Sequence, residues 1–64
     1  MAIFQSDLDK EELTRRLRRG FRIPDDVIEK VKNGGSLDIN DLLNVREQLE
    51  RQGFREDRDF SWKE

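Results

Sequence analysis

Two stretches of this sequence repeat one pattern: LDKEELTRRLRRGFR at residues 8–22 and LDINDLLNVREQLERQGFR at residues 37–55. Each begins with Leu-Asp, has an acid three residues after that aspartate and then a leucine, and ends in Gly-Phe-Arg. An aspartate before a helix accepts hydrogen bonds from the amides of the first turn, and an acid in that turn favours the positive helix end. Glycine ends a helix at little conformational cost. The pattern predicts helices over about residues 9–19 and 38–52.

A third helix is predicted between these two. The stretch IPDDVIEKVKNGG, residues 23–35, places Pro24 at a suitable first helical position, acids at Asp25 and Asp26, and Gly34 as a stop. This predicts a helix over about residues 24–33. Apolar residues recur at helical spacing in all three segments: Leu13 and Leu17; Val27, Ile28 and Val31; Ile39, Leu42, Leu43 and Leu49.

Short amphipathic helices with short connections cannot bury their apolar faces alone, so these helices are expected to pack together. We therefore expect an all-α fold, a small three-helix bundle with short irregular N- and C-terminal arms. The expected organisation is an N-terminal arm at residues 1–8, a three-helix domain at 9–54 and an acidic-aromatic tail at 55–64. Two copies are too few for a solenoid, so similar capping accounts for the repeat. An ancient duplication is the alternative.

The tail, REDRDFSWKE at residues 55–64, has no helical period. If it is extended, Phe60 and Trp62 lie on the same side of the chain. Two interpretations follow: the rings fold back to cover the helices, or the tail is an arm that docks on a partner. Ile3 and Phe4 pose the same choice in the N-terminal arm.

The composition argues against catalysis. The chain has no histidine, cysteine or tyrosine, which removes the commonest general base, the thiolate nucleophile and the phenol. Its 15 carboxylates fall mostly in helix caps, mixed-charge faces and the tail, so no two of them stand out as an acid and a base. We expect no enzyme activity, no cofactor and no metal site.

Chain length and hydropathy indicate what to expect of stability, association and location. A 64-residue domain buries only roughly 60% of the surface that its unfolded chain exposes, and no cysteine is present to brace it. Stability is expected to be marginal, which favours association with a partner or with a second copy. No apolar run approaches the ~18 residues of a membrane span. We expect a cytoplasmic protein without a membrane segment.

Five arginines crowd the end of the first predicted helix, with no acid among them: Arg15, Arg16, Arg18, Arg19 and Arg22. One turn earlier, Glu11 and Glu12 are placed to pair with some of these arginines, and Asp25 and Asp26 are placed to neutralise others. A solvated, internally paired face is one interpretation. Contact with an acidic protein or with nucleic-acid phosphate is the other.

The charge balance favours a protein partner. Residues 1–32 carry 8 basic and 7 acidic side chains, residues 33–64 carry 5 basic and 8 acidic ones, and the pI is about 5.2. Domains that bind nucleic acid are usually basic, with a pI above about 9. Arginine also suits protein interfaces, because its planar fork makes paired bonds to carboxylates.

The leading hypothesis is therefore a non-enzymatic protein-protein interaction module, such as an adaptor, inhibitor or regulatory subunit, that acts by occupying a surface. The alternative is a nucleic-acid-binding regulator that uses the arginine cluster of the first helix, either as a monomer or as a dimer. The candidate contact residues are Arg15, Arg18, Arg19, Arg22, Phe60 and Trp62.

Overall fold

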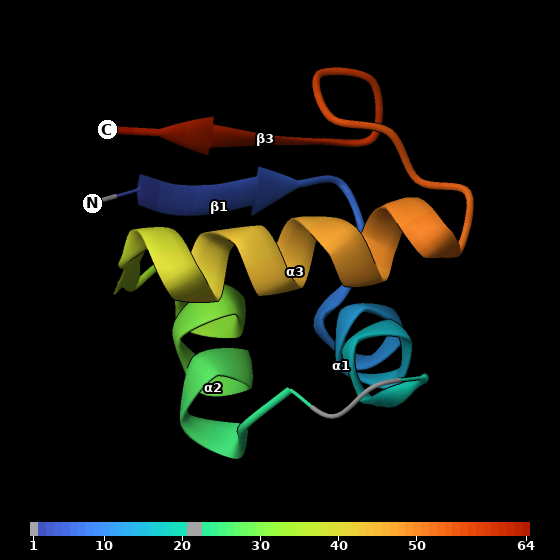
Figure 1. The fold of residues 1–64 in the computed structure, drawn as a ribbon, viewed down its shortest axis with the longest axis horizontal. Helices are drawn as coiled ribbons and strands as arrows, with labels where there is room; N and C mark the ends of the chain where they lie inside the picture. The colour runs from blue at the N-terminus through green and yellow to red at the C-terminus, as the bar shows by residue number, and fades with distance from the viewer. Residues whose placement is uncertain (1, 21–22) are drawn as a thin grey trace.

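The computed structural model describes residues 2–20 and 23–64, and within them the protein has three helices and three short strands (Figure 1). In chain order these elements are β1 (Ala2–Ser6), α1 (Lys10–Arg18), α2 (Asp25–Asn33), β2 (Ser36–Leu37), α3 (Ile39–Arg51) and β3 (Phe60–Lys63). Each helix begins and ends within one residue of the range predicted from the sequence.

The expectation of an all-α three-helix bundle is wrong, because both arms are strands of one sheet. The strand order is β2-β1-β3, and both pairings are antiparallel. Phe4 lies opposite Trp62 and Ser6 opposite Phe60, whereas β2 contributes only two residues on the other side of β1. An extended segment leaves its peptide groups without partners, and the two arms supply those partners to each other. The fold is therefore a mixture of helices and an antiparallel sheet.

The repeated Leu-Asp motif caps two helices in the predicted way. Asp9 accepts a hydrogen bond from the Glu12 amide at 2.7 Å before α1, and Asp38 accepts one from the Asp41 amide at 2.9 Å before α3. The glycines that follow α1 and α3 have φ angles of 77° and 93°. These local interactions explain why both helices start and stop where the sequence pattern indicated.

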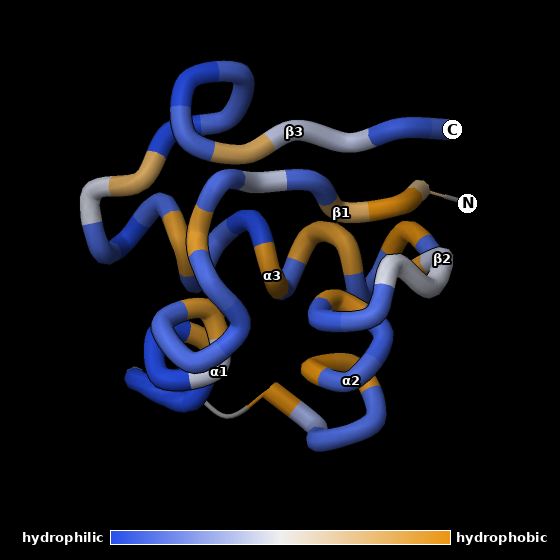
Figure 2. Tube along the Cα trace, turned by 180° about the vertical axis from the view of Figure 1, so that it is seen from behind, coloured by the Kyte–Doolittle hydropathy of each residue, from blue (hydrophilic) through white to orange (hydrophobic). Residues whose placement is uncertain are grey.

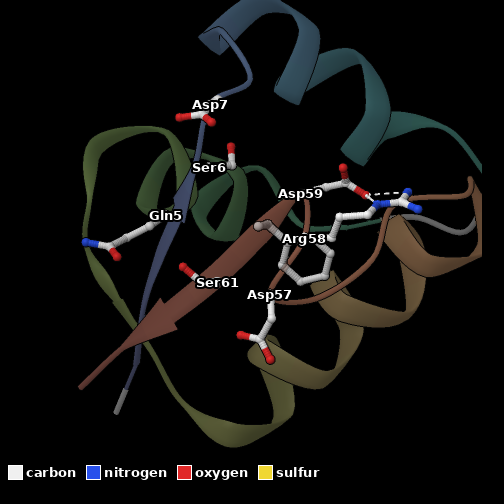
Figure 3. A pocket seen from close by; sticks show the side chains of 8 residues that line it. Gln5, Ser6, Asp7, Asp57, Arg58, Asp59 and Ser61 are labelled. Atoms are coloured by element: carbon white, nitrogen blue, oxygen red, sulfur yellow. Dashed lines mark hydrogen bonds and ion pairs between the residues drawn. The ribbon is translucent and has the colours of Figure 1, made fainter.

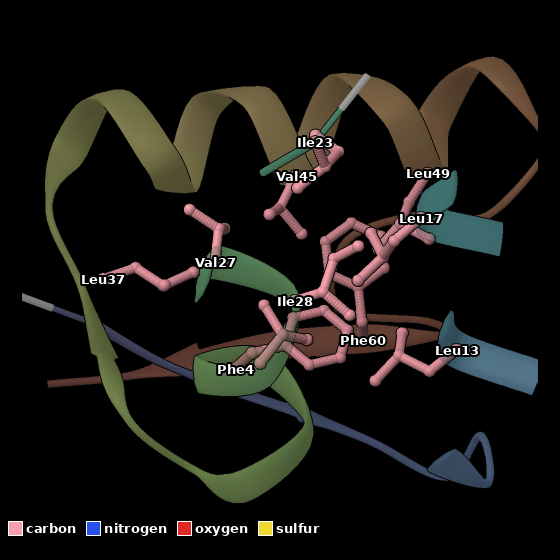
Figure 4. Close-up of a cluster of buried hydrophobic side chains, with 11 residues drawn as sticks. Phe4, Leu13, Leu17, Ile23, Val27, Ile28, Leu37, Val45, Leu49 and Phe60 are labelled. Carbon is pink, nitrogen blue, oxygen red and sulfur yellow. The ribbon is translucent and has the colours of Figure 1, made fainter. Parts of the chain in front are cut away.

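One apolar core lies between the sheet and the helices. In Figure 4, α3 passes on one side of the buried cluster and β1 and β3 pass on the other. Figure 2 shows apolar stretches of the three helices gathered around the middle of the molecule. Ile39 and Leu43 were expected in the buried face of the third helix, but both are exposed. Every element contributes to the cluster: Phe4, Leu13, Leu17, Ile23, Val27, Ile28, Val31, Leu37, Val45, Leu49 and Phe60.

Three aromatic rings join the two long strands to this core. Phe4 of β1 stacks on Phe60 of β3 with ring centroids 5.6 Å apart, and it meets the edge of Trp62 at 5.3 Å. Phe60 and Trp62 are 6.2 Å apart and nearly perpendicular. Rings in these arrangements attract one another beyond the gain from burial, so the arms are held to the helices by their side chains as well as by the sheet.

No helix within residues 2–20 and 23–64 is long and apolar enough to cross a membrane.

Candidate interaction surface

The predicted contact arginines project from the last turn of α1. The side chains of Arg15 and Arg18 are 70% and 62% exposed, and Arg19, which follows the helix, is also exposed. Arg22 lies outside the described residues. We name Arg15, Arg18 and Arg19 the arginine surface.

A single carboxylate serves two of the arginines of α1. Glu12 binds Arg15 Nη2 at 2.7 Å through one oxygen and Arg16 Nε at 2.8 Å through the other. Arg16 also lies over the ring of Phe54, 5.4 Å from its centroid, and is only 31% exposed. Arg16 therefore has a structural role, whereas Arg15 shares its counter-ion and projects into solvent.

The last two arginines of the surface are less neutralised. Arg18 reaches Asp25 at 3.4 Å, a long contact between two exposed side chains. Ion pairs of this kind contribute little to stability. Arg19 has no carboxylate within ion-pair distance among residues 2–20 and 23–64. Positive charge therefore remains at this end of α1 after internal pairing is counted.

Two glutamines, one in α3 and one at its C-cap, bind a backbone carbonyl at the end of α1 that a basic side chain would otherwise bind. Gln48 Nε2 and Gln52 Nε2 both donate to the Arg16 carbonyl, at 3.2 and 2.6 Å. A helix end leaves such carbonyls unsatisfied, and basic side chains often bind them. Amide donors take that place here, which leaves the guanidinium groups of the arginine surface available to a ligand.

Sequence reasoning missed Gln48, which is 2% exposed. Its signal was its position: it lies between Val45 and Leu49 at helical spacing, on the face that turns to the core. A buried amide at such a position is stable only where it has hydrogen-bond partners. The position therefore pointed to a polar contact between helices.

Shallow hollows surround the arginine surface. One of about 520 Å³ is lined by Glu12 and four arginines of α1 and its end, one of about 450 Å³ includes Arg18 and Gly20, and one of about 210 Å³ lies between Arg19 and Arg51. They meet at Arg18, Arg19 and Gly20. A flexible acidic chain would find several guanidinium groups within reach here.

The two aromatic contact candidates lie elsewhere. Phe60 is 4% exposed in the core and Trp62 is partly buried against it, and both belong to β3. The structure therefore does not bring these rings together with the arginine surface of α1. Phe60 has almost no surface left for a partner.

An acidic hollow of about 300 Å³ lies where β1 ends and the 57–59 loop leads into β3 (Figure 3). Gln5, Ser6 and Ser61 line it together with the carboxylates of Asp7, Asp57 and Asp59. Among the described residues that line it, only Arg58 is basic, and it is bound to Asp59 at 2.7 Å. The residues that the structure describes hold no group of three metal-binding side chains.

Asp59 organises the loop beside this hollow. It accepts hydrogen bonds from the Arg58 side chain at 2.7 and 2.9 Å and from the Arg55 amide at 2.7 Å. The Arg58 hydrogen bond, followed by the Arg55 amide, lowers the pKa of Asp59 below the usual aspartate value. The charged form of Asp59 therefore stabilises the folded loop.

Asp59→Asn is expected to lower the urea midpoint at neutral pH and to lose that effect in acid. Because the pKa of Asp59 is lowered on folding, its contribution is complete above the unfolded-state value of about 3.9. The contribution disappears as the pH falls through the lower folded-state pKa. Urea titrations of both proteins at a series of pH values measure this difference. A gap that stays constant into strong acid would contradict it, and Glu64→Gln serves as an exposed control.

Comparison of the chain with protein-family models, with curated proteins and with solved structures finds no match.

Proposed function

We propose that this protein is a non-enzymatic interaction module that binds an acidic segment of a protein partner through Arg15, Arg18 and Arg19. The observation that carries the proposal is Arg19, an exposed guanidinium without a carboxylate partner among the described residues, beside two exposed arginines whose counter-ions are shared or distant. Guanidinium groups bind carboxylates through paired, charge-assisted hydrogen bonds, so an acidic segment is the complementary ligand.

The rest of the molecule supports a protein ligand over nucleic acid. The net charge is −2, and the acidic hollow gathers three carboxylates against one guanidinium on the same small domain. A phosphate backbone is attracted to the arginine surface but repelled by the remainder of the chain. A short acidic peptide contacts the arginine surface without approaching the hollow.

The proposal is tested by titrating the protein with a short peptide rich in aspartate and glutamate. Arg18→Gln together with Arg19→Gln is expected to weaken binding by about tenfold or more, equivalent to about 1.4 kcal/mol. Raising the salt concentration is expected to weaken wild-type binding, because these exposed charges are screened. Calorimetry, or amide shifts of α1 in NMR spectra, provides the measurement.

A matched control separates the site from net charge. Lys30→Gln together with Arg55→Gln removes the same charge from exposed positions outside α1 and is expected to leave most of the affinity. If both double variants lose the same affinity for the peptide, binding depends on net charge and not on the arginine surface. If the protein does not bind the acidic peptide but shifts generic duplex DNA in a gel, and this shift requires Arg18 and Arg19, the surface binds nucleic acid instead.

A further inference from the structure

The hydrogen bonds around Phe60 show which peptide groups of β3 face β1 and which face outward. The Asp57 amide donates to the Phe60 carbonyl at 2.6 Å, and Glu56 forms a parallel bridge with Phe60. The peptide groups of Phe60 therefore turn away from β1. Peptide groups alternate in direction along a strand that is paired antiparallel. Those of Ser61 and Lys63 must then face β1, and those of Trp62 must face outward.

The outward peptide groups of β3 have different surroundings. The loop that precedes the strand covers Phe60, whereas Trp62 has no backbone partner on that side among the described residues. Figures 1 and 2 show β3 as the outermost strand in two opposite views. An unpaired strand edge is a template for pairing with another strand. Its open stretch runs from Ser61 to Lys63.

We propose that this edge pairs with β3 of a second copy, antiparallel and about a two-fold axis at Trp62. The amide of each Trp62 then donates to the carbonyl of the other, and Ser61 of one copy lies opposite Lys63 of the second copy. A two-fold contact needs a self-complementary segment. The open stretch has this property, because residues 61–63 of one copy pair with residues 61–63 of the other. At each end of the contact, the loop at 55–59 of one copy marks where the pairing stops.

Charge complementarity supports a second copy as the occupant. Side chains alternate along a strand, so Ser61 and Lys63 lie on the solvent side of the sheet, opposite to the buried Phe60. Ser61 lines the acidic hollow (Figure 3), and Lys63 of the second copy is placed beside Ser61 in this pairing. Asp7 and Asp57 have no ion-pair partner within residues 2–20 and 23–64. Each copy thus supplies an ammonium group to an acidic hollow of the other.

The dimer is expected to be weak. The contact adds only two backbone hydrogen bonds and two solvated ion pairs, and association must also overcome lost translational freedom. We expect a dissociation constant of roughly 0.1–1 mM for so small an interface. Association should therefore appear only in concentrated protein.

Amide hydrogen exchange by NMR tests the strand assignment and the dimer together. The amides of Ser61 and Lys63 are expected to be protected at every concentration. The Trp62 amide is expected to exchange fast at about 0.05 mM and to become several-fold slower at about 1 mM, in parallel with dimer formation in sedimentation. Fast exchange of Trp62 throughout, with a monomer at every concentration, would overturn the proposal. Protection of Trp62 in dilute monomer would overturn it too.

Charge variants identify the contact at the hollow. Lys63→Glu and Asp57→Lys are each expected to weaken the dimer by about tenfold or more, and the double variant is expected to recover it. Protection of the Ser61 amide confirms that each variant is folded. Arg19→Gln should leave the dimer unchanged, so a dimer that depends on Arg19 would overturn this contact. Failure here leaves the acidic-peptide proposal intact, because that proposal concerns a different surface.

Discussion

Phe60→Ala is expected to lower the urea midpoint of the protein strongly. Phe60 is 4% exposed, stacks on Phe4 and meets Trp62, so its loss opens a cavity where β1, β3 and the helices meet. Removing a buried phenylalanine side chain costs about 3–5 kcal/mol. A chain of 64 residues has a total stability of roughly 3–10 kcal/mol at ordinary values per residue. The substitution therefore removes a large part of the total.

Urea titration followed by circular dichroism and Trp62 fluorescence measures this effect. Phe54→Ala is the matched control, since it removes the same atoms from a partly buried ring that packs at the rim of the core and beneath Arg16. Its expected cost is about 1–2 kcal/mol. Equal urea midpoints for Phe60→Ala and wild type would show that the ring does not hold the strands to the helices.

Gly20→Val is expected to cost about 3 kcal/mol, the larger effect of two matched glycine variants. Gly20 has φ of 77°, which a β-branched residue adopts only with strain, and a Cβ there would lie 3.2 Å from Gln48 Oε1. The substitution thus strains the backbone and presses on the buried amide that joins α3 to the Arg16 carbonyl. Side-chain amide resonances of Gln48 should shift or broaden if that contact is displaced.

Gly53→Val separates backbone strain from the pressure on Gln48 as causes of the lost stability. Gly53 has φ of 93°, but no atom lies within 4 Å of the position that a Cβ would take, so only backbone strain applies, at about 1–2 kcal/mol. Chemical denaturation of both variants gives the comparison. If the two lose the same stability, a side chain at position 20 does not disturb Gln48, and backbone strain alone accounts for both losses.

The helices could be predicted from the sequence because their signals are local. Asp9 and Asp38 bind amides three residues away, and a glycine lies just beyond each helix. All the information needed to place these caps is contained in a few neighbouring residues. The boundaries predicted from it were therefore close to those in the structure.

The sheet could not be predicted in the same way. β2 has only two residues, and Ile3 breaks the apolar-polar alternation of β1 because it lies on the less buried face. The period-two spacing of Phe60 and Trp62 was visible, but nothing near them in the sequence identifies β1 as their partner. A strand is defined by its neighbour, and here that neighbour lies at the opposite end of the chain.

The candidate site was predicted only in part. The crowding of arginines was evident, and the pairing with Glu12 and Asp25 agrees with helical spacing and proximity. The sequence did not identify the Arg16 carbonyl as the acceptor for Gln48 and Gln52. These contacts join residues 32 and 36 positions apart, so no local pattern indicates them.

The pairing of β1 with β3 has a consequence for the order of folding. Ser6 meets Phe60 and Ile3 meets Lys63, partners 54 and 60 residues apart along the chain. Helices form from contacts within one or two turns, whereas closing so long a loop carries an entropic cost that is repaid only after the strands meet. The rate of folding is therefore expected to depend on this closure. During synthesis β1 emerges long before β3, so Phe4 remains without its stacking partner until Phe60 has been made.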